Sequence, residues 1–452
     1  MKLFGTDGIR GKVNRGYMTP EMMLRVGMAI GVVLREKDGI GRQKVLIGKD
    51  TRISGYILES ALTSGICSMG VDVTLVGPIP TPGVAFLTRA LRLNAGVVIS
   101  ASHNPYHDNG VKIFSYDGFK LSGEMESRIE QLALAESCPV KRPSGSKIGK
   151  AFRLDDAAGR YIEYIKSSIP RGIDLVGMRV VIDSANGAAY KVTPQLLKEL
   201  GAEVISIHDE PDGININRDC GSLHLDSLAE EVRKHDAHIG IAHDGDADRT
   251  LFVDEKGRLV DGDLVMSIIA LELKREQRLR HDTVVMTVMS NLGIERHLER
   301  HGVKVVRTKV GDRYVVEEMR KNGYNFGGEQ SGHIVFFDYN TTGDGPITAL
   351  QVLHLMRKRN VQLSELVKGI ELYPQVLLNV PVPGRKDLKE FPAIMKLISE
   401  TVKTLGNRGR LLVRPSGTEP KIRVMVECEN ADLAKTSAER IAAAIENQLG
   451  EK

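Results

Sequence analysis

The sequence predicts an α/β protein made of three runs of alternating strands and helices, followed by a smaller α+β segment. Three observations support this fold class. Short apolar, β-branched segments alternate with helical segments over most of the chain. A linker rich in proline, serine, glycine and lysine follows the first run at 138–150, and two prolines bound a further change at 374–383. The length of 452 residues suits three or four domains of roughly 150 residues each.

The composition is that of a globular chain with balanced charge. It is 42% hydrophobic and 27% charged, so we expect large packed cores. The net charge of +4 gives no indication of nucleic-acid binding. The four cysteines form no CxxC pair, which argues against a zinc site or a disulfide framework. There is no signal-peptide core and no apolar run of ~18 residues, so we expect a cytoplasmic protein with no membrane partner.

The first run begins with a glycine-studded loop, Phe4–Gly11, in which Arg10 could bind an anion with both guanidinium nitrogens; an ordinary surface loop is the alternative. A helix is expected from Thr19 to about Lys37, because threonine favours the cap position and the following proline favours the first turn. The elements that follow are a strand at 44–47, a helix at 54–69, a strand at 71–76, a short helix at 81–91 and a strand at 96–99. This βαβ order predicts a mostly parallel sheet.

The last strand of this run stops abruptly at small and polar residues. Asn104 precedes a proline, which disfavours helix and predicts a tight, exposed turn with Ser102 at its tip. Because ligands in open α/β sheets bind beyond the carboxyl ends of strands, the Ser102 hydroxyl beside His103 is a candidate nucleophile. A polar, capped strand end is the alternative. Lys112 is a candidate for proton transfer or for pairing with a phosphate.

The second run places three aspartates after a strand. Strands are expected at 178–182, 203–207 and 238–242, and helices at 190–200 and 225–235. The last strand leads to Asp244, Asp246 and Asp248, followed by Arg249. Carboxylates at alternate positions are costly to crowd without a cation, and on a bent loop they can converge on one hard metal. We favour Mg²⁺, and Arg249 would add a positive group for the same phosphate.

An EF-hand is the rival interpretation of this loop, because Glu255 is the twelfth residue counted from Asp244. However, Arg249 occupies the sixth position, where the sharp turn needs glycine. The flanks at 239–241 and 250–253 are typical of strands rather than helices. A solvated acidic turn is a further alternative.

The third run contains a glycine-rich loop with three polar side chains. Strands are expected at 283–288 and 303–308, with a helix after each. In the loop Gly327–His333, glycines frame Glu329, Ser331 and His333. A glutamate that accepts hydrogen bonds from neighbouring hydroxyls is a common way to bind a sugar. An ordinary glycine-rich turn is the alternative.

The C-terminal segment combines two helices with two strands. Helices are expected at 388–405 and 431–449, and strands at 410–413 and 422–427. The connection from Arg414 to Arg423 offers two guanidinium groups, two hydroxyls and glycine amides. These donors suit a phosphate, and a basic hairpin turn is the alternative.

Five motifs, in order and along the whole chain, resemble those of the α-D-phosphohexomutase family. They are the Phe4–Gly11 loop, ISASHNP at 99–105, DGDADR at 244–249, GEQSGH at 328–333 and RPSGTEP at 414–420. The chain looks most like the bacterial branch that acts on glucosamine phosphates, given its length, its GEQSGH form and the VGDRYV segment at 310–315. The phosphomannomutase/phosphoglucomutase branch, which resembles GEMSGH, is the alternative, and Gln330 is the main local discriminator.

The resemblance implies four domains around a central cleft, of which three are similar α/β units with mixed sheets and the fourth is a smaller C-terminal α+β domain. We expect a phosphoserine-loop domain at 1–150, a metal-loop domain at 151–253, a sugar-loop domain at 254–370 and a phosphate-binding domain at 371–452.

The resemblance also implies roles for individual residues. The catalytic group would be the phosphoserine Ser102 with Arg10, His103, Lys112 and Arg249. Mg²⁺ would be held by Ser102, Asp244, Asp246 and Asp248. The sugar would contact Thr308, Gly311, Glu329, Ser331 and His333. The phosphate that is not reacting would bind Arg414, Ser416, Gly417, Thr418 and Arg423.

The implied reaction interconverts glucosamine 6-phosphate and glucosamine 1-phosphate through a bound glucosamine 1,6-bisphosphate, with one Mg²⁺ ion per chain, and would supply UDP-N-acetylglucosamine and cell-wall biosynthesis. A sugar-phosphate hydrolase and a non-catalytic sugar-phosphate sensor are alternatives of other classes; the intact Ser102 argues against the sensor. A homodimer, and a kinase or autophosphorylation that primes Ser102, stay open.

Overall fold

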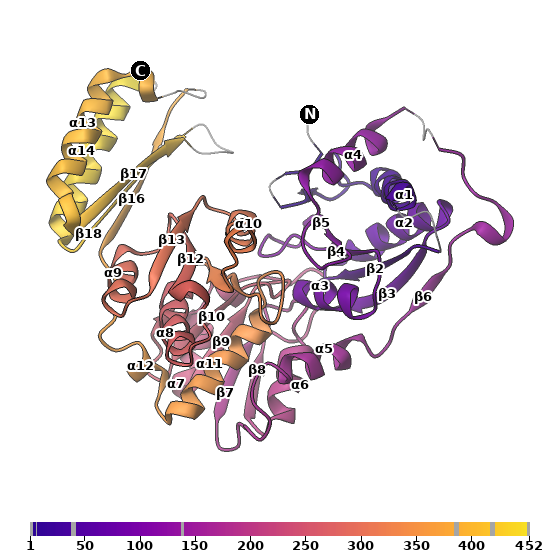
Figure 1. The fold of residues 1–452 in the computed structure, drawn as a ribbon, viewed down its shortest axis with the longest axis horizontal. Helices are drawn as coiled ribbons and strands as arrows, with labels where there is room; N and C mark the ends of the chain where they lie inside the picture. Colours follow the sequence, from indigo (N-terminus) through magenta and orange to yellow (C-terminus); the bar gives the residue numbers. More distant parts are fainter. Residues whose placement is uncertain are drawn as a thin grey trace. The chain divides into compact units, whose positions relative to one another are not determined.

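The computed structural model describes residues 3–5, 7–37, 42–136, 140–383, 388–415 and 421–449 (Figure 1). It divides into two compact units. The first unit comprises Met1–Val288 and Val306–Lys368, and the second comprises Met289–Val305 and Gly369–Lys452. Within the described ranges, no helix is long and apolar enough to cross a membrane.

The first sheet has the strand order β1-β5-β4-β2-β3-β6. The pairs β1–β5 and β5–β4 are antiparallel and the other pairs are parallel. The strands are β1 (Ile9–Lys12), β2 (Lys44–Lys49), β3 (Asp72–Pro78), β4 (Ala95–Ile99), β5 (Asp108–Ser115) and β6 (Ala151–Arg153). The helices are α1 (Pro20–Lys37), α2 (Gly55–Ser68), α3 (Thr81–Ala90) and α4 (Gly123–Leu134), with the short 3-10 turn η1 (Gly145–Lys147).

Alternating side chains give this sheet two covered faces. Val45 and Ile47 of β2 belong to the core that also contains Leu62 of α2. Gly48, the residue after Ile47, points to the other face, where a Cβ atom on it would lie 2.5 Å from the Val84 side chain of α3. Because successive Cβ atoms in a strand point to opposite faces, α2 and α3 cover opposite sides of the sheet. The loop after β4 therefore begins at the edge of a sheet that is covered by helices on both faces.

The second and third sheets are also mixed, with orders β11-β10-β9-β7-β8 and β13-β12-β14-β15. In the first sheet three of the five strand pairs are parallel, as expected, and the antiparallel strands β5, β10 and β15 make all three sheets mixed. The strands are β7 (Arg179–Asp183), β8 (Glu203–Ile207), β9 (Ile239–His243), β10 (Thr250–Asp254), β11 (Leu259–Val260), β12 (Thr283–Thr287), β13 (Lys304–Thr308), β14 (Phe326–Gly328) and β15 (Ile334–Phe336). The helices are α5 (Ala157–Lys166), α6 (Val192–Glu199), α7 (Asp226–Lys234), α8 (Gly262–Arg275), α9 (Leu292–Arg300), α10 (Asp312–Asn322), α11 (Gly345–Arg359) and α12 (Leu363–Leu366), with η2 (Gly221–Leu223) and η3 (Arg280–Asp282).

The second unit contains a small antiparallel sheet of order β16-β18-β17. Its elements are β16 (Gln375–Pro381), η4 (Leu388–Glu390), α13 (Pro392–Leu405), η5 (Gly406–Arg408), β17 (Gly409–Pro415), β18 (Lys421–Cys428) and α14 (Ala431–Leu449). Ile422 and Val424 of β18 share a core with Ile394, Ile441 and Ile445 of the two long helices. Three mixed α/β sheets and one small α+β segment confirm the predicted fold class.

A buried carboxylate, Asp344, caps α11 in the first unit. Its Oδ1 accepts hydrogen bonds from Tyr161 Oη (2.8 Å) and from the Ile347 amide (2.9 Å), and its Oδ2 accepts one from Asn340 (2.8 Å). Burial nevertheless raises the pKa of Asp344 from 3.8 to about 6. The folded state therefore binds more protons than the unfolded state between these values. Folding stability should fall as pH rises through this interval, by up to about 3 kcal/mol.

We expect Asp344→Asn to remove this pH dependence, because asparagine does not titrate. The melting temperature of the wild type should decrease between about pH 4 and pH 6 more steeply than that of the variant. Asp156→Asn, which changes a 59% exposed carboxylate, serves as the control and should keep the wild-type slope. If the melting temperatures of wild type and Asp344→Asn change equally with pH, the raised pKa of Asp344 would be contradicted.

Candidate functional site

Ser102 lies just beyond β4 with a left-handed backbone, φ +54°. Its Oγ donates a hydrogen bond of 2.6 Å to Asp244 Oδ2 and lies 3.2 Å from His103 Nδ1. The predicted turn is present, since the Asn104 amide donates to the Ala101 carbonyl. The expected exposure is wrong: Ser102 is only 2% exposed, because the aspartate loop covers it.

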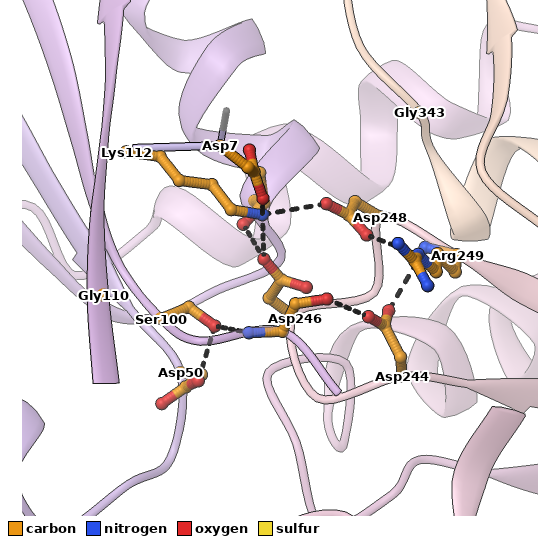
Figure 2. A network of polar contacts seen from close by, with 12 residues as sticks. Asp7, Asp50, Ser100, Gly110, Lys112, Asp244, Asp246, Asp248, Arg249 and Gly343 are labelled. Atoms are coloured by element: carbon orange, nitrogen blue, oxygen red, sulfur yellow. Dashed lines mark hydrogen bonds and ion pairs between the residues drawn. The ribbon is translucent and has the colours of Figure 1, made fainter. Parts of the chain in front are cut away.

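The three aspartates occupy the loop between β9 and β10 (Figure 2). They are buried, and each offers an oxygen within 4.8 Å of the others. Burial, with Asp248 and Asp246 nearby, raises the pKa of Asp244 well above its usual value. Among the described residues, the Oδ1 atoms of Asp246 and Asp248 are buried without a hydrogen-bond partner. Such crowded, unpaired oxygens fit a hard divalent cation. The flanking antiparallel strands exclude the EF-hand.

Lys112 of β5 supplies a positive charge to this group (Figure 2). Its Nζ lies 2.9 Å from Asp246 Oδ2 and 3.0 Å from Asp248 Oδ2, and the residue is 2% exposed. Burial opposes the charge of Lys112, but these two carboxylates and Asp7 outweigh it and raise the pKa of Lys112 well above its usual value. Lys112 therefore carries an ammonium group here and balances the negative charge of the aspartates.

Two arginines and one imidazole line the same cavity as the serine. Arg10 of β1 pairs with Asp7, and Arg249 Nε lies 4.0 Å from Asp248 Oδ1. Burial, followed by the charges of Arg249 and Arg10, lowers the pKa of His103 to about 4. The His103 ring is therefore neutral near pH 7.

A cavity of about 750 Å³ joins these groups to the glycine-rich loop. Its volume suits a small phosphorylated ligand. The predicted site residues that line it are Arg10, Ser102, His103, Asp248, Arg249, Gly311, Glu329, Ser331 and His333. Lys112, Asp244 and Asp246 are buried next to the lining residues Ser102 and Asp248. Thr308 is not among the described lining residues, and its hydroxyl donates to the Lys309 carbonyl at 3.0 Å.

The glycine-rich loop lies between β14 and β15 and is held by backbone donors. Glu329 Oε1 accepts a hydrogen bond of 3.0 Å from the Gly311 amide, and His333 Nε2 accepts one of 3.3 Å from the Gly343 amide. Gln330 instead donates to Asp261 Oδ2 at 3.1 Å, at the start of α8. Gln330, the residue by which the sequence distinguishes the two branches, thus connects the glycine-rich loop to the start of α8.

Three charged residues that the sequence reasoning did not single out complete this region. Lys120 donates to both Asp7 and Asp312, which line the cavity. Asp7 stands close to Arg10 in the first motif, and Asp312 belongs to the VGDRYV segment, so position within a motif was the available signal. Lys120 has no such signal, because only the fold brings it to the two carboxylates.

The second unit places two arginines side by side. Arg414 of β17 is directly opposite Arg423 of β18. Burial and the charge of Arg423 lower the pKa of Arg414. Like charges directly opposite on neighbouring strands are unfavourable, so the pair fits an anion that would offset them. Ser416, Gly417 and Thr418 lie outside the described residues.

A second group of potential metal ligands comprises Asp183, His208 and Cys220. The two oxygens of Asp183 accept hydrogen bonds of 2.8 Å from the amides of Ala185 and Gly221. Burial, with Asp183 nearby, raises the pKa of Cys220 to about 12, which keeps its thiol protonated. Through these two hydrogen bonds, Asp183 anchors the loop after β7 and the start of η2.

Comparisons with known proteins cover the whole chain. Models of the phosphoglucomutase/phosphomannomutase domains match as follows: alpha/beta/alpha domain I at 1–138, domain II at 159–257, domain III at 261–373 and the C-terminal domain at 377–444. Phosphoglucosamine mutase of Thermodesulfovibrio yellowstonii is 57% identical over 445 residues, which are 98% of each chain.

Solved structures share the fold. A phosphoglucomutase/phosphomannomutase family protein of Burkholderia thailandensis superposes with a TM-score of 0.81 at 24% identity, covering 98% of this chain and 97% of the other. N-acetylphosphoglucosamine mutase of Aspergillus fumigatus, solved in complex with GlcNAc-6P and magnesium, superposes with a TM-score of 0.65 at 18% identity, covering 98% and 95%.

Proposed function

Because the chain belongs to the phosphoglucomutase/phosphomannomutase family, the α-D-phosphohexomutases, along its whole length, we propose that it is a phosphoglucosamine mutase. This isomerase interconverts glucosamine 6-phosphate and glucosamine 1-phosphate. One observation carries the proposal: the Ser102 hydroxyl is held 2.6 Å from an aspartate of a metal-binding type of loop, on a cavity lined by arginines. The choice of glucosamine rests on the relative at 57% identity.

We assign Ser102 as the carrier of the transferred phosphoryl group. In the first half-reaction, the bond between phosphorus and Ser102 Oγ breaks, and a bond forms to a hydroxyl oxygen of the sugar phosphate, which gives up its proton. The product is the 1,6-bisphosphate. In the second, the phosphoryl group at the opposite end returns to Ser102, and the sugar oxygen regains a proton. His103, whose ring nitrogen lies 3.2 Å from Ser102 Oγ, is the proposed proton acceptor and donor.

Charge cancellation is the main requirement of phosphoryl transfer. Asp244, Asp246 and Asp248, together with Ser102, would hold Mg²⁺, which when bound supplies positive charge at the phosphoryl oxygens. Arg10 and Arg249 line the cavity and would bind the same oxygens. Lys112 would balance the negative charge of the aspartates. The sugar would be oriented by residues that line the cavity, namely Gly311, Glu329, Ser331 and His333.

The symmetry of the reaction requires a second phosphate site, which we assign to Arg414 and Arg423. In each half-reaction one phosphate reacts at Ser102 and the other does not. Arg414→Ala should therefore slow transfer from phosphorylated enzyme to each monophosphate by similar factors, roughly ten- to a hundred-fold, since a charge-assisted hydrogen bond contributes about 1.5–3 kcal/mol. Single-turnover rates with glucosamine 6-phosphate and glucosamine 1-phosphate measure this.

The Arg414→Ala variant should also release bisphosphate, so that its activity depends on added bisphosphate. Arg408→Ala removes an exposed arginine of the same unit and should keep the wild-type rates. A loss in one direction alone would mean that the arginine pair serves one orientation of the sugar, and the shared phosphate site would be wrong.

A product analysis tests the function itself. Phosphorylated enzyme is incubated with Mg²⁺ and, separately, with the 6-phosphates of glucosamine, glucose and mannose, and isomer and inorganic phosphate are quantified. We expect isomer without free phosphate and the highest kcat/KM for glucosamine. Preference for glucose or mannose would favour the other branch, free phosphate would indicate a hydrolase, and binding without conversion would indicate a sensor.

The domain bounds, the homodimer, the priming kinase or autophosphorylation, the cytoplasmic location and the roles of Thr308, Ser416, Gly417 and Thr418 stay predictions.

A further inference from the structure

Arg52 is a fully buried arginine beneath the Ser102 loop and follows β2 along the chain. Its guanidinium donates hydrogen bonds to four carbonyl oxygens of that loop. Nη2 lies 2.9 Å from Ser102 O and 2.8 Å from Asn104 O, and Nη1 donates to Asp108 O at 3.1 Å and to Pro105 O. One side chain thus binds both ends of the turn that carries the proposed nucleophile.

A carboxylate beside Arg52 links it to the amide of Ser102. Asp50 Oδ2 accepts from Arg52 Nε at 2.8 Å. The same oxygen accepts from Ser100 Oγ at 2.6 Å (Figure 2). The Ser100 Oγ in turn accepts from the Ser102 amide at 2.9 Å. The carbonyl and the amide of Ser102 are therefore both tied to the Asp50–Arg52 ion pair.

Asn217 approaches the same carbonyls from the loop after β8. Its Nδ2 donates to Ser102 O at 2.8 Å and to Asn104 O at 3.0 Å. The aspartate loop passes equally close, since a Cβ atom on Gly245 would lie 2.6 Å from Ser102 O. Arg52 and Asn217 thus both donate to the Ser102 carbonyl oxygen, and the aspartate loop packs against it.

The serine loop needs such support for two reasons. Ser102 has φ +54°, a conformation that L-residues rarely adopt and that persists only where surrounding contacts hold it. A phosphoserine also brings a charge of about −1.5 to −2 next to three carboxylates, which tends to push the loop away. Arg52, paired with the buried Asp50, holds this loop through four of its carbonyl oxygens.

We propose that Arg52 is a positioning residue for phosphoryl transfer, holding the Ser102 phosphoester in line with the sugar oxygen by binding the loop carbonyls. The proposal rests on the proposed mutase function. Arg52 is absent from the described residues that line the cavity, so it acts through Ser102 and not on the substrate. It also explains why an arginine, with donors fixed in a plane, occupies this buried position.

The test compares Arg52→Lys with wild type in steady-state kinetics with glucosamine 6-phosphate. Lysine keeps the charge but cannot reach four carbonyls with one ammonium group. We expect kcat to fall by about a hundred-fold, because a misplacement near 1 Å has that effect, while KM stays within about two-fold. The isolated phosphoenzyme should also lose phosphate to water faster than wild type does. Arg179→Lys, which alters an arginine bound to the His235 carbonyl, should change none of these values.

A second variant guards against failure to fold, which circular dichroism and melting temperature would reveal. Asn217→Gly removes the other donor, and glycine accepts the φ of +57° at this position without strain. It should lower kcat by a smaller factor, again with KM unchanged. Unchanged kcat in the folded variants, or a rise in KM with kcat unchanged, would overturn the proposal. Absence of mutase activity in the wild type would instead contradict the proposed function.

Discussion

Ser102→Ala is expected to abolish isomerisation, with activity below detection in both directions. The hydroxyl is the proposed carrier of the phosphoryl group and donates a hydrogen bond of 2.6 Å to Asp244. Without it, the phosphoryl group has no acceptor in the second half-reaction. The fold should remain, because one lost hydrogen bond changes the free energy of unfolding by about 1 kcal/mol.

The measurement is the conversion of glucosamine 6-phosphate followed by phosphorus NMR, with melting temperature as the check on folding. Ser64→Ala removes an exposed serine of α2 and should retain wild-type activity. Intact-mass analysis should find one extra phosphoryl group on part of the wild-type protein and none on Ser102→Ala. Substantial turnover by the variant would defeat the phosphoserine assignment.

Asp246→Asn should have the next largest effect. The change removes one negative charge from the three aspartates, and Asp246 Oδ1 is one of the buried oxygens left free for a cation. A hard divalent ion then loses a charged ligand, so Mg²⁺ affinity should fall more than about ten-fold. Because metal stabilisation of the transition state amounts to several kcal/mol, kcat should fall by about a hundred-fold or more.

Titration calorimetry with Mg²⁺ and steady-state rates over a Mg²⁺ series measure the two effects separately. Asp236→Asn is the matched control, since Asp236 is exposed and its φ of +46° suits asparagine. If the chelator EDTA and Asp246→Asn each leave the rate unchanged, the aspartates do not hold a catalytic metal.

Elements with a strong local pattern could be predicted closely. α1 begins at Pro20, as expected, and Thr19 Oγ1 accepts a hydrogen bond of 3.3 Å from the Met22 amide. β8 and α14 have the predicted bounds, 203–207 and 431–449. Capping chemistry and hydrophobic periodicity act over a few residues, so the sequence alone contains them.

Elements whose pattern is interrupted were harder to predict. α13 begins at Pro392 and not at Leu388, because the residue before a proline disfavours helix; Leu388–Glu390 form a separate 3-10 turn. β16 lies within the proline-bounded segment that indicated only a change of domain. β5 begins with polar residues at Asp108 and pairs antiparallel with β4, which a βαβ pattern does not predict.

The site divides in the same way. The alternate aspartates and the serine turn are local patterns, and the structure brings Ser102 Oγ within 2.6 Å of Asp244 Oδ2. The supports of the serine loop are not local, since Arg52 and Asn217 lie 50 and 115 residues from Ser102. The burial of Ser102 depends on the aspartate loop of the second sheet. The sequence of the serine loop alone therefore could not predict it.

A single-turnover experiment follows the transfer of the phosphoryl group from Ser102 to the sugar. Phosphorylated enzyme is mixed with Mg²⁺ and one equivalent of glucosamine 6-phosphate, quenched over time and examined by intact-mass and phosphorus NMR measurements. We expect the protein to lose one phosphoryl mass as glucosamine 1,6-bisphosphate appears, and to regain it as glucosamine 1-phosphate forms. Formation of glucosamine 1-phosphate while the phosphoryl group on Ser102 remains in place would contradict it.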